Sequence, residues 1–132
     1  MPSGERVLVI EDEELVATAL LSRLTAMGYE VEWADRAALG LERLRAWAPA
    51  CVLLDLRMPE MDGFEVLRRL RLENLPGTPP VIVVSANYQE GARRQALDLG
   101  AAAFVGKPYK ASDLLREVRR VIDEHAEVPA EG

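Results

Sequence analysis

Three acidic residues follow two apolar runs that are typical of buried strands. Glu11 and Asp12 come directly after Val7–Ile10, and Asp55 comes directly after Cys51–Leu54. A carboxylate at the end of a buried strand lies where α/β proteins carry out chemistry. Three carboxylates in one cleft repel one another, so we expect a divalent cation to neutralise them. Hard oxygen ligands favour Mg²⁺, with Asp12 and Asp55 as its main carboxylates.

Two further polar side chains follow the next two apolar runs. Ser85 follows Val81–Val84, and Lys107 follows Phe104-Val105 after one glycine. With a cation shielding it, the Asp55 carboxylate can attack a phosphoryl group and become an aspartyl phosphate, which is a form of covalent catalysis. Lys107 would pair with the new anion, and the Ser85 hydroxyl would donate to a phosphoryl oxygen. These side chains predict a phosphoryl-acceptor site.

The elements that must position these side chains alternate in type, which indicates βαβ units and a parallel sheet. The expected strands are Val7–Ile10, Tyr29–Trp33 as a half-exposed edge strand, Cys51–Leu54, Val81–Val84 and Ala103–Val105. The expected helices are one that ends at Gly28, one capped by Asp35 and stopped by Pro49, one after Gly63, one over about Gly91–Leu99, and a long one from about Ser112. Right-handed crossovers place helices on both faces of the sheet and bring the carboxyl ends of the strands to one edge.

The length, composition and charge of the chain favour one globular domain and argue against several classes of protein. The 132 residues, 49% hydrophobic and 29% charged, fit one domain over residues 1–127 with a disordered tail at 128–132. The formal net charge of −6 argues against direct binding to nucleic acid or to anionic membranes. No apolar stretch approaches the roughly 20 residues of a membrane span, and the N-terminal residues lack the pattern of a signal peptide. We therefore expect a cytoplasmic location.

The motifs together resemble those of the CheY-like receiver domain of two-component response regulators, from Arg6 to about Glu127. They are Glu11-Asp12, Leu54-Asp55-Leu56-Arg57-Met58-Pro59 with Asp62-Gly63, Val84-Ser85-Ala86, and Gly106-Lys107-Pro108. Each motif alone is weak, but their order and their positions at expected strand ends make the set specific. The resemblance implies an α/β fold with a doubly wound, five-stranded parallel sheet of strand order 2-1-3-4-5, the flavodoxin-like order, and five helices.

The resemblance also implies roles for the residues around the metal. Asp55 matches the phosphoacceptor, Asp12 matches the main metal carboxylate, and Glu11 matches its acidic neighbour. Arg57 matches the residue whose backbone carbonyl completes the metal shell, and Lys107 matches the phosphate-pairing lysine. Glu11 is one methylene longer than the Asp often found at this position, and we expect the Mg²⁺ site to survive this change.

Four residues are expected to control the switch and its lifetime. Ser85 matches the switch hydroxyl, and Phe104 matches the aromatic residue whose rotamer accompanies activation. Because phenylalanine has no hydroxyl, any switch at this position works through packing. Arg57 and Asn87 match positions at which similar proteins tune hydrolysis of the phosphorylated state.

The function implied is a phosphorelay signalling switch that assists its own phosphorylation and dephosphorylation, and not an enzyme. Its phosphoryl donor would be a sensor histidine kinase or a histidine phosphotransfer protein. A downstream protein would bind the face formed by the expected helix at 91–99, the strand at 103–105 and the final helix. Formation of a homodimer on activation is left open.

Three other functions compete with this one. A degenerate receiver would only bind proteins. A Mg²⁺-dependent aspartyl phosphatase usually carries a second acid two residues after its nucleophile, where this chain has Arg57. A nucleotide-binding module would carry a glycine-rich loop after the first strand, where this chain has Glu11–Glu14. For Asp12, capping of the first helix is the structural alternative.

Overall fold

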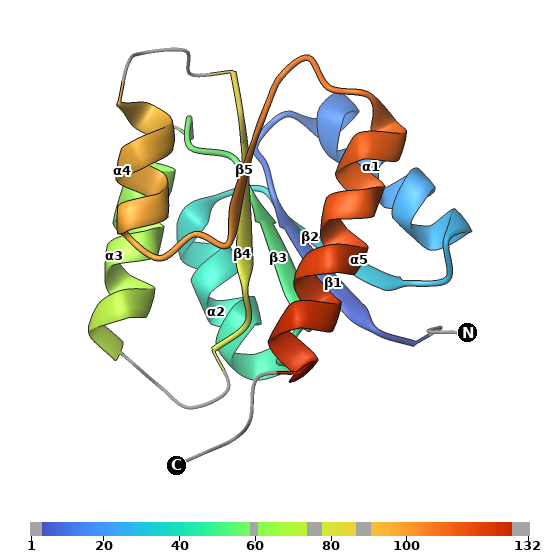
Figure 1. Cartoon of the computed structure of the whole chain (residues 1–132), viewed down its shortest axis with the longest axis horizontal. Coiled ribbons are helices and arrows are strands. Elements are labelled where there is room, and N and C mark those ends of the chain that lie inside the picture. Colours follow the sequence, from blue (N-terminus) through green and yellow to red (C-terminus); the bar gives the residue numbers. More distant parts are fainter. Residues whose placement is uncertain (1–3, 59–60, 74–77, 87–90, 128–132) are drawn as a thin grey trace.

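The computed structural model describes residues 4–58, 61–73, 78–86 and 91–127, so Asn87 and the tail at 128–132 lie outside the described residues. Strands and helices alternate along the chain (Figure 1). The strands are β1 (Arg6–Ile10), β2 (Glu30–Ala34), β3 (Cys51–Leu54), β4 (Val81–Ser85) and β5 (Ala103–Gly106). The helices are α1 (Glu14–Ala26), α2 (Ala37–Trp47), α3 (Gly63–Glu73), α4 (Ala92–Asp98) and α5 (Ala111–Glu127).

The five strands form one parallel sheet in the order β2-β1-β3-β4-β5, which confirms the predicted fold class. Helices α2, α3 and α4 lie on one side of the sheet, and α1 and α5 lie on the other (Figure 1). Strands β3 and β4 are buried along their whole length because continuous Val, Ile and Leu runs have an apolar side chain for each face.

Alternating side chains of β1 divide the core into two clusters. Leu8 and Ile10 belong to the cluster beneath α2, α3 and α4, whereas Val7 and Val9 belong to the cluster beneath α1 and α5. Successive residues of a strand point to opposite faces, so one apolar run serves both clusters. Complete burial of one such side chain contributes about 1.5–3 kcal/mol. This burial fixes the strand ends from which the polar side chains project.

The C-terminal end of α1 matches the prediction, whereas the N-terminal end of α2 differs from it. Gly28 follows α1 with a φ of +96°, a conformation that glycine adopts at little cost after a helix. The predicted N-cap of α2 is wrong. Arg36 is extended, with φ −157° and ψ 161°, so α2 begins at Ala37 and Asp35 lies one residue too early to cap it. The structural alternative for Asp12, capping of α1, is also not supported, because Glu13 takes the N-cap position.

Within the described residues, no helix combines the length and the apolar character that crossing a membrane would require.

Candidate functional site

The three acids predicted from the sequence meet at the carboxyl edge of the sheet. Ile10 pairs with Leu54 in the β1–β3 register, so Glu11 and Asp55 leave the sheet side by side. One carboxylate oxygen from each of Glu11, Asp12 and Asp55 lies within 4.8 Å of the others. Glu11 and Asp55 are only 3% and 7% exposed, and Asp12 is more open to solvent. The structure thus brings these acids together, while their role as metal ligands stays a prediction.

Lys107, which follows β5, contacts two of the three acids. Its Nζ lies 3.2 Å from Glu11 Oε1 and 3.1 Å from Asp55 Oδ2. Its backbone N–H donates to the Ser85 carbonyl at 2.9 Å, which fixes this residue to the end of β4. The sequence predicted Lys107 beside Asp55 but did not predict its ion pair with Glu11.

The acidic cluster contains more acidic than basic side chains. Burial and neighbouring charges shift the pKa values of Glu11 and Lys107. Burial raises the pKa of the Glu11 carboxyl to about 7. The negative charge of Asp55 adds to this rise, whereas the hydrogen bond from the Glu13 N–H and the positive charge of Lys107 oppose it. For Lys107, burial alone would lower the pKa, but the charges of Asp55 and Glu11 outweigh burial and raise it. Lys107 is therefore charged at neutral pH, and its single positive charge is shared by a cluster with three acidic side chains.

This donor set fits Mg²⁺. The three residues offer hard carboxylate oxygens around one point, and Mg²⁺ takes oxygen ligands of this kind. A divalent cation would also offset the negative charge that one ammonium group leaves uncompensated.

The backbone around Asp55 fixes the direction of its carboxylate. The Asp55 N–H donates to the Ile10 carbonyl at 3.0 Å, and its Oδ1 accepts the Arg57 N–H at 2.9 Å. Gly63, the first residue of α3, packs directly on this segment. A Cβ at Gly63 would lie 2.7 Å from Leu56 Cα and 2.8 Å from the Asp55 carbonyl oxygen, distances that real Cβ atoms do not show. This close approach explains the glycine of the Asp62-Gly63 motif.

The other predicted residues lie close by in the sheet. Ser85 is the last residue of β4 and is fully buried. Phe104 lies opposite Val83 in the β4–β5 register and packs against the cluster beneath α2, α3 and α4. The Arg57 side chain is exposed. The switching and tuning roles of these residues stay predictions, and the role of Asn87 concerns a residue outside the described ones.

One contact at the site was not anticipated. The indole N–H of Trp33 in β2 donates to the backbone carbonyl of Glu11 at 2.6 Å. The sequence indicated Trp33 only as a residue of the edge strand. The contact depends on the β1–β2 register, in which Ile10 lies opposite Ala34, and hydrophobic periodicity does not reveal a register.

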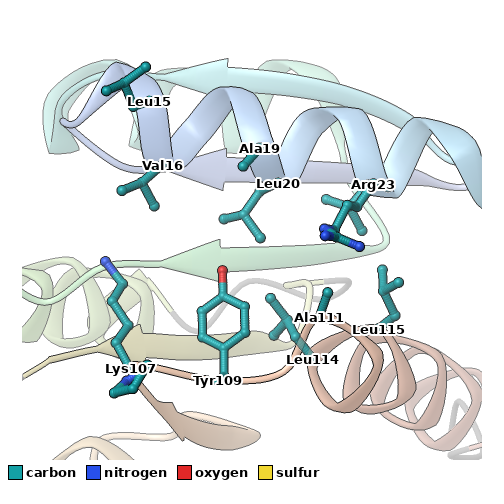
Figure 2. Close-up of a pocket in the computed structure, with 12 residues that line it drawn as sticks. Leu15, Val16, Ala19, Leu20, Arg23, Lys107, Tyr109, Ala111, Leu114 and Leu115 are labelled. Carbon is teal, nitrogen blue, oxygen red and sulfur yellow. The ribbon is translucent and has the colours of Figure 1, made fainter.

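A mostly apolar groove of about 500 Å³ lies between α1 and α5, next to the acidic cluster. Lys107 stands at one end of this groove and Arg23 toward the other, with Tyr109 between them and its hydroxyl pointing to α1 (Figure 2). The apolar side chains come from both helices and include Val16, Leu20, Leu114 and Leu115. Leu15, at the start of α1, is 86% exposed. The acidic cluster and this groove thus share Lys107.

Comparison with known protein families shows which family this chain belongs to. The response regulator receiver domain matches residues 7–119, which include all five strands except the first residue of β1. The chain belongs to this family. Receiver domains of this CheY-like type are signalling modules of two-component systems. The transcriptional regulatory protein KdpE of Mycobacterium tuberculosis is 40% identical over 118 residues, which cover 88% of this chain and 50% of KdpE. The chain spans about half the length of the first curated relatives it matches.

Solved receiver domains have the same architecture. A CheY-like receiver domain protein from Methanospirillum hungatei superimposes with a TM-score of 0.87 at 27% identity, covering 95% of this receiver and 98% of that chain. The receiver domain of the sensor histidine kinase PA1611 from Pseudomonas aeruginosa gives a TM-score of 0.82 at 26% identity, covering 92% and 99%. In that PA1611 structure a magnesium ion is coordinated in the active-site cleft.

Proposed function

We propose that this receiver is a phosphorylation-dependent switch in which Asp55 accepts a phosphoryl group from a sensor histidine kinase or a phosphotransfer protein. The observation that carries the proposal is the meeting of Glu11, Asp12 and Asp55 within 4.8 Å, with Lys107 Nζ 3.1 Å from Asp55 Oδ2. Asp12 and Asp55 would hold Mg²⁺, with Glu11 beside them and the Arg57 carbonyl completing the shell. The bound ion would offset the charge of the acids and of the incoming phosphoryl oxygens.

Asp55 has the surroundings that a phosphoryl acceptor needs. An Asp55 carboxylate oxygen would form the new P–O bond while the bond from phosphorus to the donor breaks, and the donor group leaves with that electron pair. Lys107 is already held close to Asp55 Oδ2, so a phosphoryl oxygen on Asp55 would come within its reach. Lys107 would then exchange its ion pair with Glu11 for a contact with the phosphoryl group.

Phosphorylation would reach the output face through β4 and β5. The Ser85 hydroxyl at the end of β4 would donate to a phosphoryl oxygen and draw the residues after β4 toward Asp55. Phe104 on the neighbouring strand would rotate into the space that this movement leaves. The surface of α4, β5 and α5 would change as a result, and a downstream protein would bind there. Arg57 and Asn87 would set how long the phosphorylated state lasts.

The groove between α1 and α5 supports the donor part of the proposal. The groove begins at Lys107, so a protein that brings a phosphohistidine to Asp55 would cover its near end (Figure 2). Exposed Leu15 and the apolar wall formed by Val16 and Leu20 offer that protein a surface to bury. The occupant that we propose is an apolar helix face of the histidine-containing donor.

Intact mass measured after incubation with acetyl phosphate tests the proposal. The wild-type protein should gain a single phosphoryl adduct in the presence of Mg²⁺ and none in the presence of a chelator. Asp55→Asn should gain none under either condition, while remaining folded by circular dichroism. Wild-type protein that is folded, supplied with Mg²⁺ and still unmodified would contradict the proposal and favour a receiver that only binds proteins.

A further inference from the structure

Strand β2 holds the backbone of Glu11 at two points. The Glu11 N–H donates to the Ala34 carbonyl at 3.1 Å, which continues the hydrogen-bond ladder between β1 and β2. The Glu11 carbonyl accepts the indole N–H of Trp33 at 2.6 Å, and this second bond comes from a side chain. Both polar groups of the Glu11 backbone are therefore bound to the end of the edge strand.

The bond from Trp33 acts on Asp12 as well as on Glu11. The Glu11 carbonyl and the Asp12 N–H belong to one planar peptide unit, so holding the oxygen also fixes the direction of the Asp12 N–H. Glu11 Oε2 accepts the Glu13 N–H at 3.0 Å and holds the next turn of the chain. Three hydrogen bonds thus set the path from Glu11 to Glu13, and the one from Trp33 bears directly on the peptide that leads to Asp12.

Packing fixes the indole ring that makes this bond. Trp33 is half-buried and packs, together with Val31 of the same strand, against the cluster beneath α1 and α5. Trp33 and Val31 are two residues apart, so they lie on the same face of the sheet. An indole has a single N–H donor and no acceptor, and a ring held by packing keeps that donor aimed in one direction.

We propose that Trp33 is a positioning residue for the acidic cluster. Its indole N–H holds the peptide between Glu11 and Asp12 in the orientation that keeps the Asp12 carboxylate beside that of Asp55. The inference rests on the proposed function, because it concerns the affinity of that site for Mg²⁺. Loss of a partner that orients a ligand from outside the shell typically weakens a metal site by about 10- to 100-fold, and a partner that acts through the backbone should lie at or below the lower end.

Titration calorimetry with MgCl₂ tests the inference on the full chain. Trp33→Phe keeps an aromatic ring and removes the donor, so it should bind Mg²⁺ about three- to tenfold more weakly than wild type. Val31→Ala is the matched control, because it removes packing from the same face of β2 and leaves the bond to Glu11 in place. Val31→Ala should bind within about twofold of wild type, whereas Asp12→Asn should show no binding.

Fluorescence gives a second signature that loss of packing does not produce. The chain has two tryptophans, and Trp47 lies under the Arg6 guanidinium, whose carbon is 5.4 Å from the ring centre. Trp47→Phe leaves Trp33 as the reporter, and its emission should change when Mg²⁺ binds. Trp33→Phe leaves Trp47 as the reporter, and its emission should stay constant over the same titration.

The outcomes separate this inference from the proposed function. Trp33→Phe with wild-type affinity, or Val31→Ala with an equal loss, would overturn the positioning role while the metal site stands. Constant Trp33 emission across a titration that shows binding by calorimetry would overturn it as well. Wild-type protein that binds no Mg²⁺ would overturn both the inference and the metal site on which it rests.

Discussion

Two ionic clusters occupy opposite edges of the sheet and differ in their balance of charge. The acidic cluster at the carboxyl edge contains Glu11, Asp12 and Asp55 with Lys107. The second cluster, here called the Arg119 cluster, contains Arg119, Glu5, Asp123 and Tyr29. Arg119 of α5 lies 2.8 Å from both Glu5 Oε1 and Asp123 Oδ1, and its guanidinium carbon lies 5.9 Å from the centre of the Tyr29 ring. Glu5 and Tyr29 precede β1 and β2, which places this cluster at the amino edge.

The two clusters contain the same residue types in different proportions, which suits one to stability and the other to the metal and phosphoryl chemistry that we propose. In the Arg119 cluster, both carboxylates meet a guanidinium that is one-third exposed, and the hydrogen bond to Glu5 raises the pKa of Arg119 despite partial burial. The Arg119 guanidinium, which has several N–H donors, pairs with both carboxylates. In the acidic cluster, one ammonium pairs with two of the three carboxylates, and these two, Glu11 and Asp55, are almost fully buried. By itself, that surplus of buried negative charge should destabilise the fold, and the proposed cation would offset it.

The largest expected effect on stability comes from removal of the ammonium group of the acidic cluster. Lys107→Met leaves Glu11 and Asp55 buried without their cation, and breaking a buried pair typically costs about 3–5 kcal/mol. We expect about 2 kcal/mol at pH 8 without Mg²⁺, because Glu11 can take up a proton in compensation. Urea unfolding measures this loss, and added Mg²⁺ should recover part of it. A Lys107→Met protein as stable as wild type would contradict the account of surplus negative charge.

The next effect is a dependence of stability on pH that comes from Glu11 of the acidic cluster. The pKa of Glu11 is raised from 4.5 to about 7 on folding, so the native state binds more protons than the unfolded state between these values. The contribution of Glu11 to stability is therefore complete below about pH 4.5 and is lost as the pH rises through about 7. Glu11→Gln should remove this slope and exceed wild type by about 2 kcal/mol at pH 8 without Mg²⁺. Urea unfolding across this range tests it, and parallel curves for the two proteins would contradict it.

Disruption of the Arg119 cluster should have a smaller effect that does not depend on Mg²⁺. Arg119→Met removes the ion pairs with Glu5 and Asp123 at a partly exposed site, and we expect a loss of about 1 kcal/mol. Salt should reduce the difference from wild type because exposed charges are screened. Urea unfolding at low and high NaCl checks this, with Mg²⁺ affinity by calorimetry as the control. A change in Mg²⁺ affinity would show that the two edges are coupled.

The smallest effect is expected for ion pairs on the surface of α5. Arg120 pairs with Glu117 and Glu124 at helical spacing, and its side chain is 43% exposed. Arg120→Gln should change the free energy of unfolding by less than about 0.5 kcal/mol, since exposed pairs of this type contribute little. Thermal unfolding beside Arg119→Met would rank the two positions. A loss as large as that of Arg119→Met would indicate that exposure is a poor guide to the strength of these pairs.

The sequence predicted the part of the molecule that depends on apolar runs. All five strands were predicted to within one residue at each end, because the buried strands are apolar runs and the half-exposed β2 alternates apolar and acidic residues. The meeting of Glu11 with Asp55 was also predictable, since parallel strands end at one edge. The N-cap of α2 was wrongly predicted at Asp35 because Arg36 takes that position, which depends on how β2 joins α2. The contact of Trp33 with Glu11 depends on register and could not be predicted.

The measurement that tests the central claim most directly is the effect of Mg²⁺ on urea unfolding, compared with NaCl at the same ionic strength. An ion that binds the folded state alone raises the free energy of unfolding. Mg²⁺ should stabilise wild type and Arg119→Met by the same amount and should leave Asp12→Asn unchanged. A similar gain in all three proteins, or no gain in wild type, would contradict the claim that the surplus of acid at the carboxyl edge forms a metal site.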